Sequence, residues 1–154
     1  KKILSRLEPD RFSHIVDMGA LYRPGPLKSG MVSNFIKRRH GSVYIKYVHK
    51  YLRPILSCTY GVLIYQEQVM QIAQKLSGFT AGQADILRRA MGKKKRSELE
   101  KQKQNFIAGA VKNGISKEVA AGIFLKIEPY LILMLYELNN FYLRGSIFFY
   151  SFEI

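Results

Sequence analysis

The chain has 154 residues, of which 47% are apolar, so it is long enough to bury a core, and its length favours one domain over two. Lysine and arginine number 25 against 11 aspartate and glutamate residues, which gives a formal net charge of +14. This composition excludes a fibre or a disordered chain and favours a polyanionic partner (nucleotide, nucleic acid or anionic lipid), with a merely basic surface as the alternative.

The lone cysteine and the first residues narrow the setting of the protein. Cys58 has no second cysteine with which to form a disulfide framework or a zinc cluster, and a reducing, cytoplasmic setting fits best. Residues 2–6 alternate charged and apolar side chains and lack the features of a signal peptide. Because there is also no initiator methionine, we expect the chain to begin inside a longer protein.

The first third of the chain predicts two helices separated by a rigid turn. Pro9 and Asp10 open the first helix, whose apolar residues keep helical spacing: Phe12, Ile15, Val16 and Leu21. Residues 23–26 contain two prolines and should stop this helix in a rigid turn. A short helix from Met31 to His40 should follow, with Gly41 as its terminator.

The middle of the chain begins irregularly and then becomes clearly helical. Residues 42–57, interrupted by Pro54, predict an irregular connection. Residues 62–65 are apolar and fit either a buried strand or the start of a buried helix. The next helix, ending at Gly78, carries its apolar residues on one face (Val69, Ile72, Ala73, Leu76) and its glutamines largely on the rest (Gln66, Gln68, Gln71, Gln74).

Three further helices are predicted from their capping residues. Thr80 with Gln83 and Ser97 with Glu100 have the spacing of a capping box, and Ser116 caps the third helix. Gly92, Asn113-Gly114 and Pro129 should end them. Their expected core residues are Ala84, Leu87, Ala90, Met91, Leu99, Phe106, Ile107, Ala110, Val111, Val119, Ala120, Ile123, Phe124 and Ile127. The fold class is therefore mainly α, with short helices joined by glycine turns and minor β.

From residue 130 the sequence changes to apolar runs at 131–136 and 147–150. A membrane span is the tempting interpretation, but a helix needs about 20 mostly apolar residues to cross a bilayer. Polar residues interrupt this stretch: Glu137, Asn139, Asn140 and Arg144. We therefore expect no membrane role.

The segment 87–96 (Leu-Arg-Arg-Ala-Met-Gly-Lys-Lys-Lys-Arg) is the strongest candidate for holding phosphate. Arg88 and Arg89 project about 100° apart around a helix, so each can reach a different phosphate. One arginine can bind two phosphate oxygens at once, whereas Lys93 and its neighbours act as mobile point charges. The alternative is a solvated charge run between two helices.

Two other segments combine polar side chains with rigid or buried backbone. In residues 60–68, a buried apolar stretch runs into Gln66, Glu67 and Gln68 at a helix start, where Glu67 could simply complement the helix dipole. In residues 21–26, the turn would fix Tyr22 and Arg23, although a purely structural turn explains it as well.

Together, these segments resemble the alpha subunit of bacterial DNA polymerase III, the C-family replicative polymerase. The shared motifs are Ala-Leu-Tyr-Arg-Pro-Gly-Pro at 20–26, Ser-Gly-Met-Val-x-Asn-Phe-Ile at 29–36, Thr-Tyr-Gly-x-x-x-Tyr-Gln-Glu-Gln-Val-Met-Gln-Ile-Ala at 59–73 and Leu-Arg-Arg-Ala-Met-Gly-Lys-Lys at 87–94. The resemblance spans roughly residues 3–129. Ordered, nearly unbroken matches of this length are more specific than a single short motif.

The resemblance implies part of a polymerase fingers domain, which closes on the incoming deoxynucleoside triphosphate beside the template. By this analogy Arg88, Arg89 and Lys93 contact the triphosphate, and Tyr22, Arg23, Gln66 and Glu67 line or brace its pocket. The other basic residues assigned to DNA are Lys37, Arg38, Arg39, Lys94, Lys95 and Arg96. The implied partners are template-primer DNA, the rest of the alpha subunit and the other holoenzyme subunits.

The chain departs from the family in two respects. It has no Asp-x-Asp pair, and Asp10, Asp17 and Asp85 are isolated in sequence and interpreted as surface or capping residues. No catalytic or metal-ligating residue is therefore assigned, the Mg²⁺ ligands of the full-length enzyme are expected elsewhere, and this fragment alone should not polymerise.

The family's continuation, Gly-Tyr-Gly-Phe-Asn-Lys-Ser-His, is absent from residues 130–154. We therefore divide the chain into a partial fingers domain, 1–129, and an apolar tail, 130–154, of the kind that a frameshift or truncation produces. Two alternatives stay open for the whole chain: a non-catalytic, basic nucleic-acid-binding module and a nonfunctional remnant.

Overall fold

The structure, a computed structural model, describes residues 2–92 and 96–139, and this part of the chain is helical without strands. The predicted mainly α fold is confirmed, while residues 62–65 form an extended segment that pairs with no strand in this part. The elements are α1 (Lys2–Leu7), α2 (Phe12–Leu21), α3 (Pro24–Lys28), α4 (Met31–Arg39), η1 (Lys50–Leu52), α5 (Arg53–Leu56), η2 (Ser57–Thr59), α6 (Gln66–Ser77), α7 (Ala81–Gly92), α8 (Arg96–Lys112) and α9 (Lys117–Asn139).

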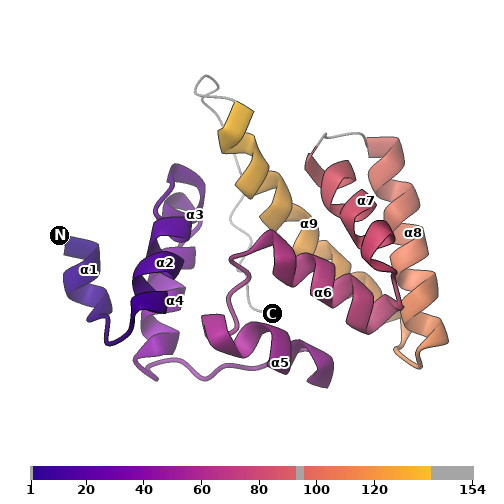
Figure 1. Cartoon of the computed structure of the whole chain (residues 1–154). Coiled ribbons are helices and arrows are strands. Elements are labelled where there is room, and N and C mark those ends of the chain that lie inside the picture. The colour runs from indigo at the N-terminus through magenta and orange to yellow at the C-terminus, as the bar shows by residue number, and fades with distance from the viewer. Residues whose placement is uncertain (1, 93–95, 140–154) are drawn as a thin grey trace.

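The helices form two groups that meet at α9. Helices α1 to α4 lie together at the N-terminal side, and α6 to α9 pack on one another, with α9 contacting both α3 and α7 (Figure 1). One continuous core runs through both groups and includes Phe35, Ile72 and Phe124, all fully buried. Phe106 lies between Phe79 and Phe124, with ring centroids 6.3 and 5.4 Å away. This core fixes α6 and α7 side by side.

Three helix ends in the second group follow the predicted capping chemistry, whereas the predicted cap Ser97 lies inside α8, which already begins at Arg96. Thr80 and Gln83 form a reciprocal capping box at the start of α7, with hydrogen bonds of 2.9 and 3.3 Å. The Ser116 hydroxyl accepts from the Val119 amide at the start of α9. Gly78, directly after α6, has a φ of +67°, a left-handed conformation that glycine adopts without a Cβ penalty. The cap formed by Thr80 and Gln83 fixes where α7, the helix that carries Arg88 and Arg89, begins.

Three proline predictions are wrong. Part of the connection at 42–57, expected to be irregular and interrupted by Pro54, is helical, because η1 and α5 span residues 50–56 and Pro54 lies in the first turn of α5. Residues 24–28 form the one-turn helix α3 instead of a turn, because prolines are tolerated in the first turn, where amide groups have no intrahelical partner. Pro129 does not end its helix, since α9 continues to Asn139 through leucine-rich sequence of high helix propensity. Within the described residues, no helix is long and apolar enough to cross a membrane.

On α2 and α8, the residues that are buried differ from those that the apolar spacing predicts. On α2 the side chains of Phe12, Ile15 and Val16 are exposed, and His14 and Asp17 are buried with Met18 and Leu21. On α8, Val111 is exposed instead of buried, although Phe106 and Ala110 are in the core as expected. The buried polar residues of α2 reach the segment before α6, as described below.

Gln68 organises the extended segment that leads into α6. The sequence pattern placed Gln68 with the exposed glutamines, but its side chain is buried. Its Oε1 accepts from the amides of Ile64 and Tyr65 at 2.8 and 3.0 Å, and its Nε2 donates to the Thr59 hydroxyl at 2.9 Å. These bonds supply partners to backbone amides that burial would otherwise leave unpaired, and they fix where α6 begins.

Candidate functional site

The site centres on the last two turns of α7 and the first residue of α6. Arg88 donates from Nη1 to Oε1 of Gln66, at 3.2 Å, and thereby links the two helices. Arg89 is the next residue on α7 and lies near its C-terminal end. The structure therefore brings together three of the residues that the sequence assigned to nucleotide binding, and we call Gln66, Asp85, Arg88 and Arg89 the arginine cluster.

Asp85 holds both arginines. Its Oδ1 accepts from Nε of Arg88 at 2.9 Å and lies 2.8 Å from Nη2 of the same guanidinium. Its Oδ2 lies 2.7 Å from Nε of Arg89. The hydrogen bond from Arg88, together with the charges of both guanidinium groups, holds the pKa of the Asp85 carboxyl below its usual value, despite partial desolvation. Asp85 is therefore ionised at neutral pH and orients both side chains.

The two arginines differ in how many of their guanidinium nitrogens are engaged by neighbouring side chains. The side chain of Arg88 is 32% exposed, and its contacts to Asp85 and Gln66 engage all three of its nitrogens. The side chain of Arg89 is 64% exposed, and within the described residues only its Nε is engaged, by Asp85. Its two terminal nitrogens can therefore form a bidentate fork with an oxyanion, while Arg88 braces the helix pair and presents its remaining N–H groups.

The lysine part of the predicted phosphate segment cannot be placed. Lys93, Lys94 and Lys95 lie outside the described residues. Arg96 begins α8, and its side chain is likewise outside the described part. Their assignments to nucleotide and DNA remain predictions from the sequence.

The other predicted nucleotide residues lie at helix ends. Glu67 is exposed in the first turn of α6, next to Gln66 and in the position that suits a helix dipole. Tyr22 follows α2 with its ring exposed, and Arg23 precedes α3, donating from Nε to the Ala20 carbonyl at 2.8 Å. Helix α9 packs against α3 on one side and against α7 on the other (Figure 1).

Of the three basic residues at the end of α4, Lys37 differs from the two arginines in its surroundings. Its side chain is exposed, whereas Arg38 is 4% exposed and donates to the Gly61 carbonyl at 3.0 Å. Arg39 is 10% exposed; its Nη2 lies 3.6 Å from the Asp10 carboxylate, and it also donates to the Glu8 carbonyl. The structure thus favours a structural role for Arg38 and Arg39.

Asp17 is not a surface residue as predicted. It is 3% exposed, and the Tyr65 hydroxyl donates to its Oδ1 at 2.5 Å. One helical turn earlier, His14 lies 2.6 Å from the Tyr60 hydroxyl. Burial raises the pKa of Asp17 and lowers that of His14. Through these two contacts α2 supports the segment that positions Gln66.

The described residues do not fit a metal centre. Among them, no three His, Cys, Asp or Glu side chains converge as metal ligands would. Asp85 is engaged by two arginines and Asp17 by Tyr65, while Asp10 lies 3.0 Å from His14. The arginine cluster can bind and orient an anion, but it supplies no carboxylate pair to hold an ion.

Asp85 is the residue of the arginine cluster that sequence reasoning missed. Its spacing to Arg88 and Arg89 is i+3 and i+4, at which side chains meet on one helix face. That spacing could have identified it as the counterion of both arginines. Its isolation from other carboxylates led instead to its interpretation as a surface or capping residue.

Comparisons with known proteins identify the family of the chain. A family described as "Bacterial DNA polymerase III alpha subunit finger domain" matches residues 1–114. The chain is 54% identical over 135 residues to DNA polymerase III subunit alpha of Escherichia coli, 52% to that of Pasteurella multocida and 49% to that of Pseudomonas aeruginosa. Each alignment covers 84% of this chain and 12% of the relative. The chain therefore belongs to the finger-domain family of the bacterial DNA polymerase III alpha subunit and corresponds to a fragment of that subunit.

Proposed function

We propose that this chain supplies the triphosphate-binding surface of a replicative, template-directed DNA polymerase. The observation that carries the proposal is the pair Arg88 and Arg89, held side by side on α7 by a single carboxylate, Asp85. Phosphoryl transfer depends on cations that stand in place before charge develops on the transferred group. Arginines oriented in advance by a carboxylate meet that requirement.

The residues of the cluster take different parts in this proposal. Arg89 binds phosphate oxygens through its two terminal nitrogens, and Arg88 adds a second cation while remaining tied to Gln66. Lys93 adds a third charge from the segment beyond α7. Tyr22, Arg23 and Glu67 line or brace the nucleotide pocket in the complete protein. No residue of this chain is proposed to act as the catalytic base or as a metal ligand.

The wider activity belongs to a protein of which this chain spans about 12%. We propose that the complete subunit transfers deoxynucleotides on template-primer DNA in the cytoplasm, in a holoenzyme with other subunits, using Mg²⁺ held outside this chain. Lys37, Lys94, Lys95 and Arg96 then contact DNA, and Arg38 and Arg39 support α4 beside it. The fragment alone should not polymerise, because the described residues do not fit a metal centre.

The boundary at residue 129 and the origin of the tail stay predictions. The proposed boundary falls inside α9, and residues 140–154 lie outside the described part of the chain. A nonfunctional remnant differs from a working fragment in one measurable way, since a remnant binds no nucleotide.

The second candidate function is a non-catalytic, basic nucleic-acid-binding module, which the net charge of +14 favours. It predicts salt-dependent DNA binding by this chain with no preference for a triphosphate. Calorimetric titration of the chain with thymidine and its mono-, di- and triphosphate separates the two candidates. We expect the affinity to rise with each added phosphate, because each brings oxygens to the arginine cluster.

Equal affinity for thymidine and its triphosphate would overturn the proposed function. Inorganic tripolyphosphate serves as the control ligand, since it carries the phosphates without base or sugar. If the arginine cluster determines the binding, tripolyphosphate should bind almost as tightly as the nucleotide. If contacts to the base dominate, tripolyphosphate should bind much more weakly than the nucleotide.

A further inference from the structure

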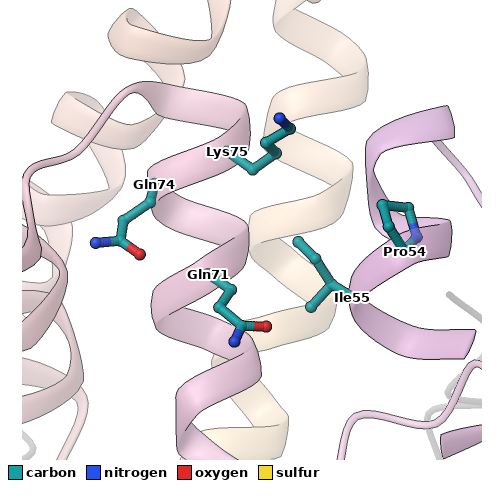
Figure 2. A pocket seen from close by; sticks show the side chains of 5 residues that line it. All are labelled: Pro54, Ile55, Gln71, Gln74 and Lys75. Atoms are coloured by element: carbon teal, nitrogen blue, oxygen red, sulfur yellow. The ribbon is translucent and has the colours of Figure 1, made fainter. Parts of the chain in front are cut away.

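An open groove of about 440 Å³ lies between α5 and α6, apart from the arginine cluster. It is lined by Pro54, Ile55, Gln71, Gln74 and Lys75. Ile55 on α5 faces the side of α6 that carries Gln71 and Lys75, so an apolar wall stands opposite an amide and an ammonium (Figure 2). Its volume falls within the range of about 300–1,000 Å³ that is common for small-ligand sites.

Lys50 and Lys75 place positive charge beside this groove. The sequence from residue 18 to residue 66 contains eight lysines and arginines and no aspartate or glutamate. The Nζ atoms of Lys50 and Lys75 lie 5.5 and 5.8 Å from the centroid of the same Tyr51 ring. Within the described residues neither lysine has an ion pair. Two ammonium groups close to one ring form a positively charged patch, which favours an anionic ligand.

The other groups of the groove are those that recognise a nucleobase. Ile55 and Pro54 offer apolar surface to a base, and the amide of Gln71, which points toward Ile55 (Figure 2), both donates and accepts hydrogen bonds. Bases can reach such a surface only when they are unpaired, and single-strand sites typically combine basic residues with apolar or aromatic platforms. An acidic protein segment would engage the lysines but offers no planar base to the apolar surface.

We propose that the groove between α5 and α6 binds one nucleotide of a single DNA strand, with its base against Ile55 and its phosphates on Lys50 and Lys75. The site is separate from the arginine cluster, because it uses the middle and last turns of α6, whereas Gln66 at the first residue of α6 contacts Arg88. The two sites can therefore be lost independently, and this proposal does not depend on the proposed function.

The test measures binding of a fluorescent 12-residue thymidine oligonucleotide to the whole chain over a range of salt concentrations. Lys50→Gln and Lys75→Gln are expected to weaken binding and to make the slope of log affinity against log salt shallower by about 0.7 each, one phosphate contact on a single strand. Both lysines are exposed, so neither substitution threatens the fold. Lys28→Gln on α3 removes the same charge away from the groove and should leave the slope almost unchanged.

The base is tested with an abasic 12-residue oligonucleotide and the variant Gln71→Ala. This variant should weaken binding of the thymidine strand to the level of the abasic strand, and leave the abasic strand and tripolyphosphate unaffected. The proposal is overturned if Lys28→Gln changes the slope as much as the groove variants. It is also overturned if abasic and thymidine strands bind the parent chain equally, or if duplex DNA or polyglutamate displaces the strand as well as free single strand does.

Discussion

The double variant Arg88→Ala/Arg89→Ala is expected to bind thymidine triphosphate about 100-fold more weakly than the parent chain. A hydrogen bond to a charged group contributes about 1.5–3 kcal/mol, and the variant removes at least two such bonds. It also leaves the Asp85 carboxylate without its two cations, and this carboxylate then repels the incoming phosphates. Isothermal titration calorimetry at fixed salt concentration measures the change.

Matched variants separate this loss from a loss of net charge. Lys28→Ala/Lys117→Ala removes two positive charges from exposed positions on α3 and α9 and should weaken binding only slightly. Asp85→Asn keeps both arginines but removes the carboxylate that orients them, and should weaken binding about fivefold. The substitution removes the screened repulsion between Asp85 and the phosphates, but the entropy lost when two mobile arginine side chains become ordered on binding is the larger effect. A loss of affinity in the lysine pair equal to that in the arginine pair would contradict a specific site.

Replacing Gly109 by alanine is expected to destabilise the protein by about 3 kcal/mol. A Cβ at this position on α8 would overlap the carbonyl oxygen of Ser77 and lie 3.0 Å from its carbonyl carbon. Ser77 is the last residue of α6, so the obstacle is backbone, and the helices must separate to admit the methyl group. Urea unfolding followed by circular dichroism gives the difference in free energy.

Helix propensity alone predicts the opposite sign for this substitution, since alanine is favoured over glycine inside a helix by about 1 kcal/mol. Gly122→Ala in α9 is the matched control, because a Cβ there meets nothing within 4 Å. It should stabilise the protein by up to about 1 kcal/mol. If Gly109→Ala proved as stable as the parent chain, the close contact between α6 and α8 would be incorrect.

Local sequence patterns predicted most helix boundaries because capping is local chemistry. The bonds between Thr80 and Gln83, and from Val119 to Ser116, join residues three apart and depend on no distant contact. Proline was harder to interpret, since its effect depends on its position in the helix. A proline, Pro24, begins α3, whereas α9 continues through Pro129.

Burial could not be predicted as well, because it is decided by neighbours that are distant in sequence. On α2, apolar spacing marks Phe12, Ile15 and Val16, yet His14 and Asp17 are the residues that meet Tyr60 and Tyr65, more than 40 positions away. Gln68 is buried for the same reason, by its bonds to the 59–65 segment.

The candidate site was predictable in part. Arg88 and Arg89 followed from the charge run and the capped helix, and Asp85 was visible in the i+3 and i+4 spacing. The contact of Gln66 with Arg88 joins residues 22 positions apart and required the packing of α6 on α7. The groove between α5 and α6 likewise depends on how two helices lie against each other, and no sequence spacing indicates it.

The most direct test of the central claim, that Arg88 and Arg89 contact the triphosphate, is nuclear magnetic resonance of their guanidinium Nε–H groups. Single Arg→Lys variants assign the two signals in the labelled chain. We predict that both signals shift on addition of thymidine triphosphate, that the Arg89 signal shifts more, and that thymidine moves neither. Unchanged Arg88 and Arg89 signals at a triphosphate concentration that shifts other residues would contradict the account.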